Sequence, residues 1–523
     1  METHGRKTIY ANYTEEQLLS GTPEEIDAMV LDILNNSIQI HLDNKAESEY
    51  LQDYLYGIQD IRNKEKKTRT DINNTGVENW AWAFMDWKKA FLVGKPIQYA
   101  PLDDVANEEI STLNKYNVFE GKNQKDQDMY EDIFTVGRGF RYNNASPVTD
   151  EDEAPFDILN LDVLHTEVVY SSSIYHEQLL SFVETSKKYI VQGINPETKK
   201  KENMTKYYTE YTVYTRNTKY VINDKSGQLK IVDQVINDGK KTIKLKRVPI
   251  IQGIHLITEY YFNNRRMSLL EICKDIFDDI NYVENLDKDD IEQFVNAIMV
   301  FTNAEIDNER LELIKKYGAV SIKSTDQKKA SVELLQSRLK SLDTQIYYLR
   351  KLSALHAILS VPEATQNGTI SNAETGKAVL TGQGFTSASI RVETEENAFK
   401  KCDRNALKVI LKICRNSKDS GIKELKVSDI DIKFSRDLSD NLLVKTQALL
   451  SLTEAQIPPE IRNAVVNLFS DPLSVTKMQE AYMKEQQEIQ KELELRKSNN
   501  NESKINENNN KTEDTTQLEN QQQ

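Results

Sequence analysis

The stretch Leu269-Leu-Glu-Ile-Cys-Lys-Asp-Ile-Phe-Asp-Asp-Ile-Asn-Tyr-Val283 is the first of two helical patterns that decide the fold. Its apolar residues recur at helical spacing, and a second series further along alternates four and three like a coiled-coil seam. The first series is Leu269, Ile272, Ile276, Ile280 and Val283, and the second is Leu335, Leu339, Leu342, Ile346 and Leu349. Between them, Phe301 to Ala330 contains a short strand pattern at Tyr317-Gly-Ala-Val-Ser-Ile322 and a polar loop. The sequence therefore predicts two long helices with a small unit inserted at their tip.

The region before this pair changes from a helical to an extended pattern. Thr22-Pro-Glu-Glu25 has the form of a capping box with proline at the first helical position, which predicts the start of an N-terminal helix. The apolar face of that helix would be Ile26, Met29, Val30, Ile33 and Leu34. From Val163 to Ile251 the period becomes two, with turn signals at Asn223-Asp-Lys-Ser-Gly227 and Asn237-Asp-Gly239. We expect a β-rich region of hairpins there.

The region after the pair is mainly helical. A helix with one clear apolar face is followed by an alternating, strand-like segment from Lys423 to Phe434 and by helical patterns from Leu442 to Leu495. The apolar face of the first of these helices is Phe399, Cys402, Ala406, Val409 and Ile413. The tail from Ser498 to Gln523 is so polar that we expect it to be disordered. The predicted class is α+β, mainly helical.

Size, charge and cysteine content restrict the kind of protein. A chain of 523 residues exceeds what one hydrophobic core usually organises. Its 67 Lys and Arg against 82 Asp and Glu give a net charge of −15, which disfavours tight wrapping on a phosphate backbone. Three cysteines without C-x-x-C spacing indicate neither a disulfide framework nor a zinc knuckle. Residues 1–13 contain no apolar signal segment, and no apolar run approaches the ~18 residues of a bilayer span. We therefore expect a chain made in a reducing cytosol, with neither secretion nor membrane insertion.

Catalytic motifs are largely missing. Gly376-Lys377 and Gly94-Lys95 lack the surrounding residues of a phosphate-binding loop, and the six histidines form no H-E-x-x-H pair. The acidic run Asp287-Lys-Asp-Asp290, with Glu284 and Glu292, resembles a two-metal nuclease site, although a solvated helix face explains it more simply. Trp80, Trp82 and Trp87 could stack on bases, but tryptophans at this spacing are more often core or interface residues. The sequence predicts no catalytic residues, no metal and no cofactor, hence no enzyme.

Several segments resemble the gp6-like portal proteins of tailed bacteriophages, the SPP1 type. Phe91-Leu-Val-Gly-Lys-Pro-Ile-Gln-Tyr99 is similar to their Y-L-x-G-K-P-I-x-Y segment, and Tyr54-Leu-Tyr-Gly57 to an earlier Y-Y-x-G. Phe134-Thr-Val-Gly-Arg-Gly-Phe-Arg-Tyr142 is similar to their small-residue turn before a β segment, and Val248-Pro-Ile-Ile251 to their I-P-I-I strand before the first long helix. In the family's S-G-x-A-L loop, this chain keeps Gly376, Ala378 and Leu380 but has Thr375 in place of serine. The similarity runs from about Tyr50 to Pro472, and the order of its parts carries it.

The resemblance implies a subunit with a β-rich wing, a two-helix stem, a small α/β clip and a helical crown. Its expected parts are an N-terminal helical segment (1–49), the wing (50–264), the first stem helix (265–300), the clip (301–330), the second stem helix (331–360), the tunnel loop with a long wing helix and returning strand (361–440), the crown (441–497) and the tail (498–523).

The resemblance also implies a structural function in the virion. We expect a ring of twelve copies, assembled in the host cytoplasm and placed at one capsid vertex, whose channel conducts double-stranded DNA during packaging and ejection without sequence readout. Its expected partners are the terminase, the head-tail connector, and the major capsid and scaffolding proteins. The expected channel-loop residues are Gln366, Asn367, Thr369, Ser371, Asn372 and Lys377. The expected clip contacts are Glu305, Asp307, Arg310, Lys315, Lys316, Lys323, Lys328 and Lys329.

Two other functions stay open on the sequence alone. A capsid-interior scaffold or minor head protein would share the acidic charge and polar tail but would lack the paired helices and would not close into rings. A packaging nuclease or motor subunit would cleave DNA with a divalent metal or turn over ATP, and the missing phosphate-binding loop already counts against the motor.

Overall fold

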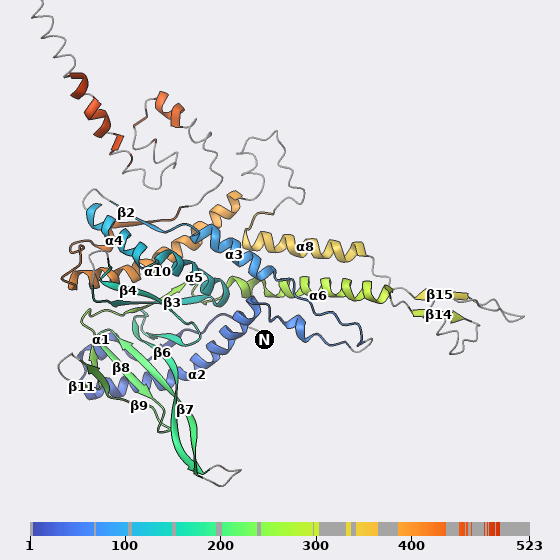
Figure 1. The fold of residues 1–523 in the computed structure, drawn as a ribbon, viewed down its shortest axis with the longest axis horizontal. Helices are drawn as coiled ribbons and strands as arrows, with labels where there is room; N and C mark the ends of the chain where they lie inside the picture. The colour runs from blue at the N-terminus through green and yellow to red at the C-terminus, as the bar shows by residue number, and fades with distance from the viewer. Residues whose placement is uncertain are drawn as a thin grey trace, which may run out of the picture. The chain divides into compact units, whose positions relative to one another are not determined.

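The computed structural model describes residues 4–66, 70–102, 107–148, 153–194, 201–237, 242–295, 298–302, 331–335, 341–363, 385–435 and scattered residues from 449 to 491. The chain divides into two compact units, Met1–Arg436 and Asp437–Gln523. In the second unit, residues 449–454 and 481–486 are helical. The first unit mixes helix and sheet, as the α+β prediction requires (Figure 1).

The N-terminal part of the first unit is one long helix lying on a sheet. Strand β1 (Ile9–Ala11) and helix α1 (Glu15–Ser20) precede α2 (Pro23–Leu55), whose capping box joins Thr22 and Glu25 as predicted. Val30, Ile33 and Leu34 of the predicted face are buried, and Ile26 and Met29 pack against them at the edge. Helix α2 continues to Leu55, through the boundary expected between residues 49 and 50.

The sheet beneath α2 has seven strands in the order β1-β5-β6-β7-β8-β12, with β9 paired to β8. These strands are β5 (Thr166–Ser171), β6 (Gln178–Ile194), β7 (Lys201–Thr215), β8 (Thr218–Asn223), β9 (Lys230–Ile231) and β12 (Val248–Pro249). The predicted hairpins are confirmed, including the separate pair β10 (Gln234–Asn237) and β11 (Thr242–Leu245). The pattern did not predict β1, which joins the sheet parallel to β5 and ties the N-terminus to it.

A second, larger core gathers the middle of the chain. It includes α3 (Trp80–Val93), α4 (Asn107–Phe119), α5 (Lys122–Val136), α6 (Leu269–Val295), α8 (Ser341–Leu359) and α10 (Phe385–Asn416), and the short 3-10 helix η1 (Asp60–Asn63) contacts α6. Helix α5 ends at Gly137, whose φ of 89° turns the chain into β3 (Arg138–Ala145). Strand β3 lies between β13 (Ile257–Tyr261) and β4 (Phe156–Leu161), and β2 (Gln98–Pro101) pairs with β16 (Ile430–Lys433).

Helix α10 shows where an apolar pattern predicts burial correctly. The five residues of its predicted face, Phe399, Cys402, Ala406, Val409 and Ile413, are all buried in the larger core. The strand predicted from Lys423 is shorter than expected, because a 3-10 turn, η2 (Val427–Asp429), precedes β16. Cys273, Cys402 and Cys414 are free and buried. Within the described part of the chain, no helix is long and apolar enough to cross a membrane.

Candidate functional site: the α6–α8 helix pair

Helix α6 is fixed at its start by a buried capping arrangement. The backbone N–H of Glu271 donates to the Ser268 hydroxyl, while the N–H of Ser268 donates to the Glu271 carboxylate at 2.8 Å. The same carboxylate accepts the Arg6 guanidinium at 2.7 Å, and both side chains are buried. The helix dipole further stabilises the negative charge of Glu271 near the start of α6. The Arg6–Glu271 contact therefore holds the N-terminal segment to the beginning of this helix.

The buried face of α6 changes character along the helix. In the first half it is apolar, with Leu270, Cys273, Phe277 and Ile280 in the core. In the second half it is polar, with Asn281, Asn285 and Asp289 buried instead. These three side chains bind residues 59–66 and 70–79, which we call the strap. Asn285 Oδ1 accepts the N–H of Gly76 at 2.7 Å, and Asn281 Oδ1 accepts the N–H of Glu78 at 2.8 Å.

Asp289 is the centre of the acidic run that resembles a nuclease site. Its carboxylate accepts Lys64 at 2.8 Å, Lys66, and both the backbone and side-chain N–H of Asn74. Burial opposes ionisation of this carboxyl, but the hydrogen bonds from Lys64, Lys66 and Asn74 outweigh it and hold its pKa well below the ordinary value. The carboxylate is therefore engaged in holding the strap, and among the described residues no group of His, Cys, Asp and Glu is arranged to bind a metal ion.

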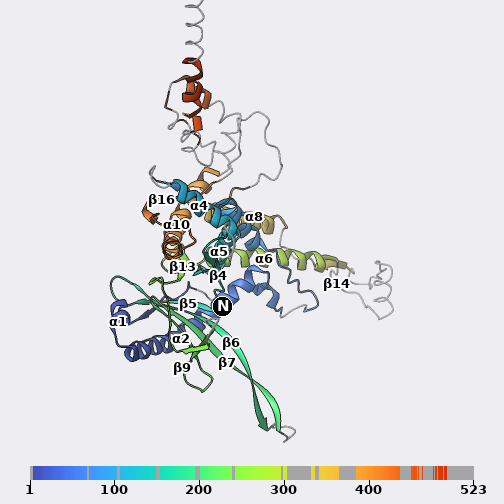
Figure 2. The ribbon, with the colours of Figure 1, turned by 60° about the vertical axis from the view of Figure 1, so that its left-hand side comes forward.

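Helix α8 packs along α6 and runs back from the same end (Figures 1 and 2). Lys351 bridges the two helices by an ion pair of 2.6 Å to Asp279. The predicted seam of this helix is wrong. Leu335 lies in strand β15 (Ser331–Leu335), the helix begins only at Ser341, and Ile346 and Leu349 are about 40% exposed. Its buried residues are Thr344, Leu355 and Leu359, on another face from the seam, so the residues expected to pair the two helices point away from the core.

The connection between the two helices begins and ends as a hairpin. Strand β14 (Ile298–Thr302) follows α6 and pairs antiparallel with β15, from Ile298 opposite Leu335 to Thr302 opposite Ser331. Strand β14 crosses the boundary expected at 300/301, and β15 occupies the residues after 330 where the second long helix was expected to start. The sequence between the strands, residues 303–330, lies outside the described residues.

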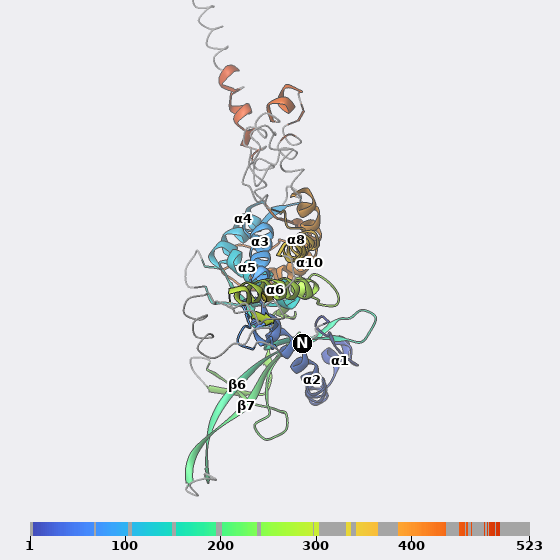
Figure 3. The ribbon, with the colours of Figure 1, turned by 90° about the vertical axis from the view of Figure 1, so that its right-hand side faces the viewer.

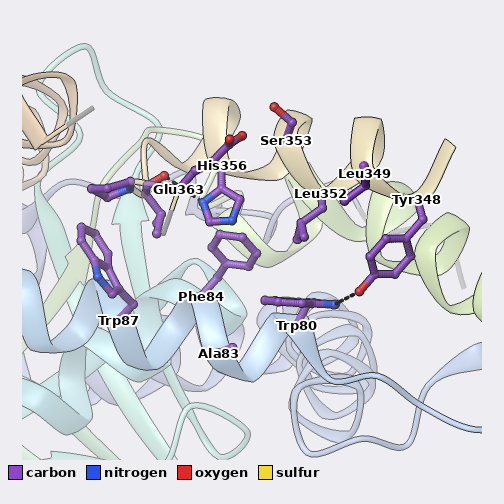
Figure 4. A pocket seen from close by; sticks show the side chains of 12 residues that line it. Trp80, Ala83, Phe84, Trp87, Tyr348, Leu349, Leu352, Ser353, His356 and Glu363 are labelled. Atoms are coloured by element: carbon purple, nitrogen blue, oxygen red, sulfur yellow. Dashed lines mark hydrogen bonds between the residues drawn. The ribbon is translucent and has the colours of Figure 1, made fainter. Parts of the chain in front are cut away.

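A groove of about 830 Å³ lies between α3 and α8, lined largely by aromatic and aliphatic side chains (Figure 4). Trp80 Nε1 donates to the Tyr348 hydroxyl, which donates to Glu78 of the strap at 2.9 Å. Phe84 meets the His356 ring edge-on at 4.9 Å, and His356 Nδ1 lies 3.0 Å from the carbonyl of Val361. His356 therefore orients the chain at the end of α8, and no hydrogen bond joins it to Ser353 of the same groove in the described structure.

The three tryptophans thus have structural roles. Trp80 and Trp87 line the groove, and Trp82, 38% exposed, lies against Tyr56 with Lys89 over its ring. A single lysine beside one ring does not make a basic surround, so base stacking gains no support here.

A comparison with protein families decides what this arrangement belongs to. Residues 34–498 match the family described as phage portal protein, SPP1 Gp6-like. The chain belongs to this portal protein family. No curated relative matches it individually. Membership implies a bacteriophage protein of the virion capsid that acts in DNA packaging as part of an oligomeric assembly, in a family that is generally structural rather than enzymatic.

The site residues predicted for the portal loops lie outside the described residues. This holds for the channel-loop residues Gln366, Asn367, Thr369, Ser371, Asn372 and Lys377. It holds equally for the clip residues Glu305, Asp307, Arg310, Lys315, Lys316, Lys323, Lys328 and Lys329. Both sets stay predictions. The described elements do fix their anchors, since β14 and β15 flank residues 303–330, and Glu363 and Phe385 flank residues 364–384.

Sequence reasoning missed the buried charges that hold the portal subunit's helices together. Asp403 of α10, 1% exposed, accepts the hydroxyl groups of Tyr99 and Tyr260 and lies 3.3 Å from the Lys122 ammonium. Burial opposes ionisation of Asp403, but Lys122 and then Arg141 outweigh it, so its pKa is lowered. One hint of this is present in the sequence. Cys402 and Ala406, on the predicted apolar face of α10, lie close to Asp403 along the helix and so place its charge next to the core.

Proposed function

We propose that this chain is the subunit of a closed ring whose axial channel conducts double-stranded DNA into and out of the capsid. The observation that supports this most is the pair of helices α6 and α8, which pack against each other and are connected along the chain by way of the β14–β15 hairpin and residues 303–330. Such a pair can stand as a stem, with its inserted unit as the clip. The sheet of β1 and β5–β8 then belongs to the wing, α10 is the long wing helix, and residues 441–497 form the crown.

The charge of the chain suits a channel that must release its cargo. Duplex DNA carries one phosphate charge per ~1.7 Å of axis, and every phosphate neutralised by Lys or Arg strengthens retention. A subunit with a net charge of −15 offers little such retention, so DNA can slide past it. On this proposal residues 366–377 contact the passing duplex without reading its sequence, and residues 305–329 dock the terminase and later the head-tail connector.

Imaging the purified full-length chain tests the proposal most directly. We expect negative-stain electron microscopy to show rings with a stain-filled centre wide enough for a duplex, and mass photometry to give one dominant mass near twelve copies of 60.2 kDa. A population of monomers at micromolar concentration, or particles with filled centres, would contradict the ring. Metal-dependent cleavage of DNA by the same sample would favour the nuclease, which the occupied Asp289 carboxylate already disfavours.

A further inference from the structure

The longest hairpin of the wing sheet extends well beyond its neighbours. Strands β6 and β7 stay paired from Leu180 opposite Thr215 to Ile194 opposite Lys201, whereas β5 pairs β6 only as far as Val183 and β8 pairs β7 only from Glu210. In the described structure no other strand pairs with residues 185–194 or 201–208, which we call the ribbon. Figures 1 and 3 show the ribbon leaving the rest of the sheet.

The ribbon has the opposite charge to the rest of the chain. Residues 185–194 and 201–208 contain four lysines and one glutamate, 4 − 1 = +3, so the remainder of the sequence carries −15 − 3 = −18. Because isolated two-stranded hairpins are marginally stable, a ribbon of this length gains from a surface to lie on. A strongly acidic protein surface would supply the complementary charge.

The two faces of the ribbon differ in what covers them. Tyr189 and Tyr208 share one face, with ring centroids 5.7 Å apart, and Lys225 of the β8–β9 turn lies over both rings. The opposite face carries Lys188 directly across from Tyr207, with Ile190 two residues along. Ile190 and Tyr207 are each 71% exposed. On one face Lys225 of the same chain therefore partly covers the apolar rings, and the other face presents two large exposed apolar side chains beside a lysine.

We propose that the Lys188–Ile190–Tyr207 face is an arm contact that docks on the acidic surface of a neighbouring copy in the oligomer. A neighbouring copy fits because each copy carries both the cationic ribbon and an acidic body, so the contact is head-to-tail and compatible with a closed ring. A nucleic acid fits less well: the ribbon contains no arginine, and a phosphate backbone would leave Ile190 and Tyr207 uncovered. The proposal rests on the oligomeric assembly proposed above.

Zero-length carbodiimide cross-linking tests the contact in the full-length protein. Equal amounts of unlabelled and ¹⁵N-labelled chain are mixed before assembly, so that a Lys188 cross-link to Asp or Glu between copies appears with mixed isotope composition. We expect such mixed cross-links from Lys188, and we expect their yield to fall at least fivefold in 0.5 M NaCl as charges are screened. Cross-links of Lys188 confined to single isotope composition would overturn the proposal.

Matched substitutions separate this face from the rest of the ribbon. Ile190→Ser with Tyr207→Ser should lower the assembled fraction at a fixed concentration at least tenfold, and Lys188→Glu should act in the same direction. Lys206→Glu, which makes the same charge change on the face covered by Lys225, is the control and should change assembly less than twofold. Circular dichroism and the melting temperature of each variant show whether the sheet has folded.

The outcomes also separate this inference from the ring itself. If the wild-type chain forms rings and the Ile190 and Tyr207 variants form them equally well, the arm contact is wrong and the ring stands. If the wild-type chain forms no assembly larger than a dimer, the ring is wrong. The arm contact is then tested in the dimers, where mixed-isotope Lys188 cross-links support it and single-isotope cross-links reject it. If a 30-base-pair duplex protects Lys188 from modification while assembly does not, the ribbon binds nucleic acid and the proposal fails.

Discussion

Lys88→Met removes the cation from a buried junction of four helices. The Lys88 ammonium of α3, with a side chain 2% exposed, contacts the Glu395 carboxylate of α10 at 2.5 Å and the carbonyl of Leu359 at the end of α8. Tyr130 of α5 donates its hydroxyl to the other Glu395 oxygen at 3.0 Å. After the substitution, Glu395 would keep only the tyrosine and would be left as a buried charge without its cation.

The size of the effect follows from that unpaired carboxylate. Breaking a buried ion pair from one side costs ~3–5 kcal/mol, whereas replacing both partners by apolar groups is often close to neutral. We therefore expect Lys88→Met to lower the free energy of unfolding by about 3–5 kcal/mol, and the double variant Lys88→Met with Glu395→Leu to recover more than half of that loss. The recovery stays incomplete because, in the double variant, the Tyr130 hydroxyl loses its acceptor on residue 395, which costs ~1 kcal/mol.

Chemical denaturation followed by tryptophan fluorescence measures this cycle, since Trp80 and Trp87 lie on the same helix as Lys88. Lys89→Met is the control, because Lys89 makes an ion pair of 2.9 Å with Glu131 near the surface, where such pairs contribute ~0–1 kcal/mol. A loss below 1 kcal/mol for Lys88→Met, or additive losses in the double variant, would refute the reasoning.

Four further predictions follow from named contacts. Gly137→Ala should lower the free energy of unfolding by at least ~1–3 kcal/mol in a denaturation experiment, because φ is +89° and an added Cβ would lie 2.0 Å from the carbonyl oxygen of Arg266. Gly121→Ala is the control, since Gly121 also has a positive φ but open space around it. Asp289→Asn should free the strap and speed proteolysis within residues 64–76, whereas Asp287→Asn, in the same acidic run, should not. Stability should be greatest between about pH 4.5 and pH 6.5. Burial lowers the pKa of His41, but the hydrogen bond to Glu184 and the negative charges of Glu167 and Glu184 raise it further, so the His41 contribution is complete below about pH 6.5 and is lost as the pH rises through the raised folded pKa. Glu184, whose pKa the His41 hydrogen bond lowers to about 2, loses its contribution as the pH falls from 4.5 toward 2. His41→Gln should therefore flatten the high-pH side of a melting-temperature profile. Replacing Gln366–Asn372 by a Gly-Ser linker should leave rings intact but impair DNA packaging in vitro, and unchanged packaging would reject the channel-loop assignment.

The parts of the fold that the sequence predicted are those whose buried faces are apolar. The α10 face was predicted residue by residue, and the capping box of α2 was predicted at the correct position, because both rest on local chemistry. The same reasoning failed for α8. The pattern joined Leu342, Ile346 and Leu349 to Leu335 as one heptad series, but Leu335 lies in strand β15 and not in the helix. An apolar pattern that alternates four and three residues does not show whether those residues pack against another helix or lie exposed on the surface. In α8 the buried residues are Thr344, Leu355 and Leu359 instead.

The candidate site was only partly accessible from the sequence because its decisive contacts are polar and distant. Asn281, Asn285 and Asp289 are spaced by four like an apolar stripe, but they are asparagine and aspartate, which a hydropathy pattern assigns to solvent. Their partners lie more than 200 residues earlier, in the strap. Only the fold brings the two segments together, so no local pattern could have revealed the pairing.

This polar half of α6 has a consequence for the proposed stem. Apolar burial is non-directional and tolerates sliding, whereas each hydrogen bond between the strap and α6 specifies one partner and one distance. The first half of α6 is held by the core, and the second half, which leads to β14, is held at a fixed register by Asn281, Asn285 and Asp289. If a helix carries a docking unit at its far end, that end must point in a fixed direction. Hydrogen bonds fix this direction more strictly than apolar burial does. The exchange of apolar for polar side chains along one helix face meets that need. It also explains why an acidic run that resembles a metal site serves instead to align α6.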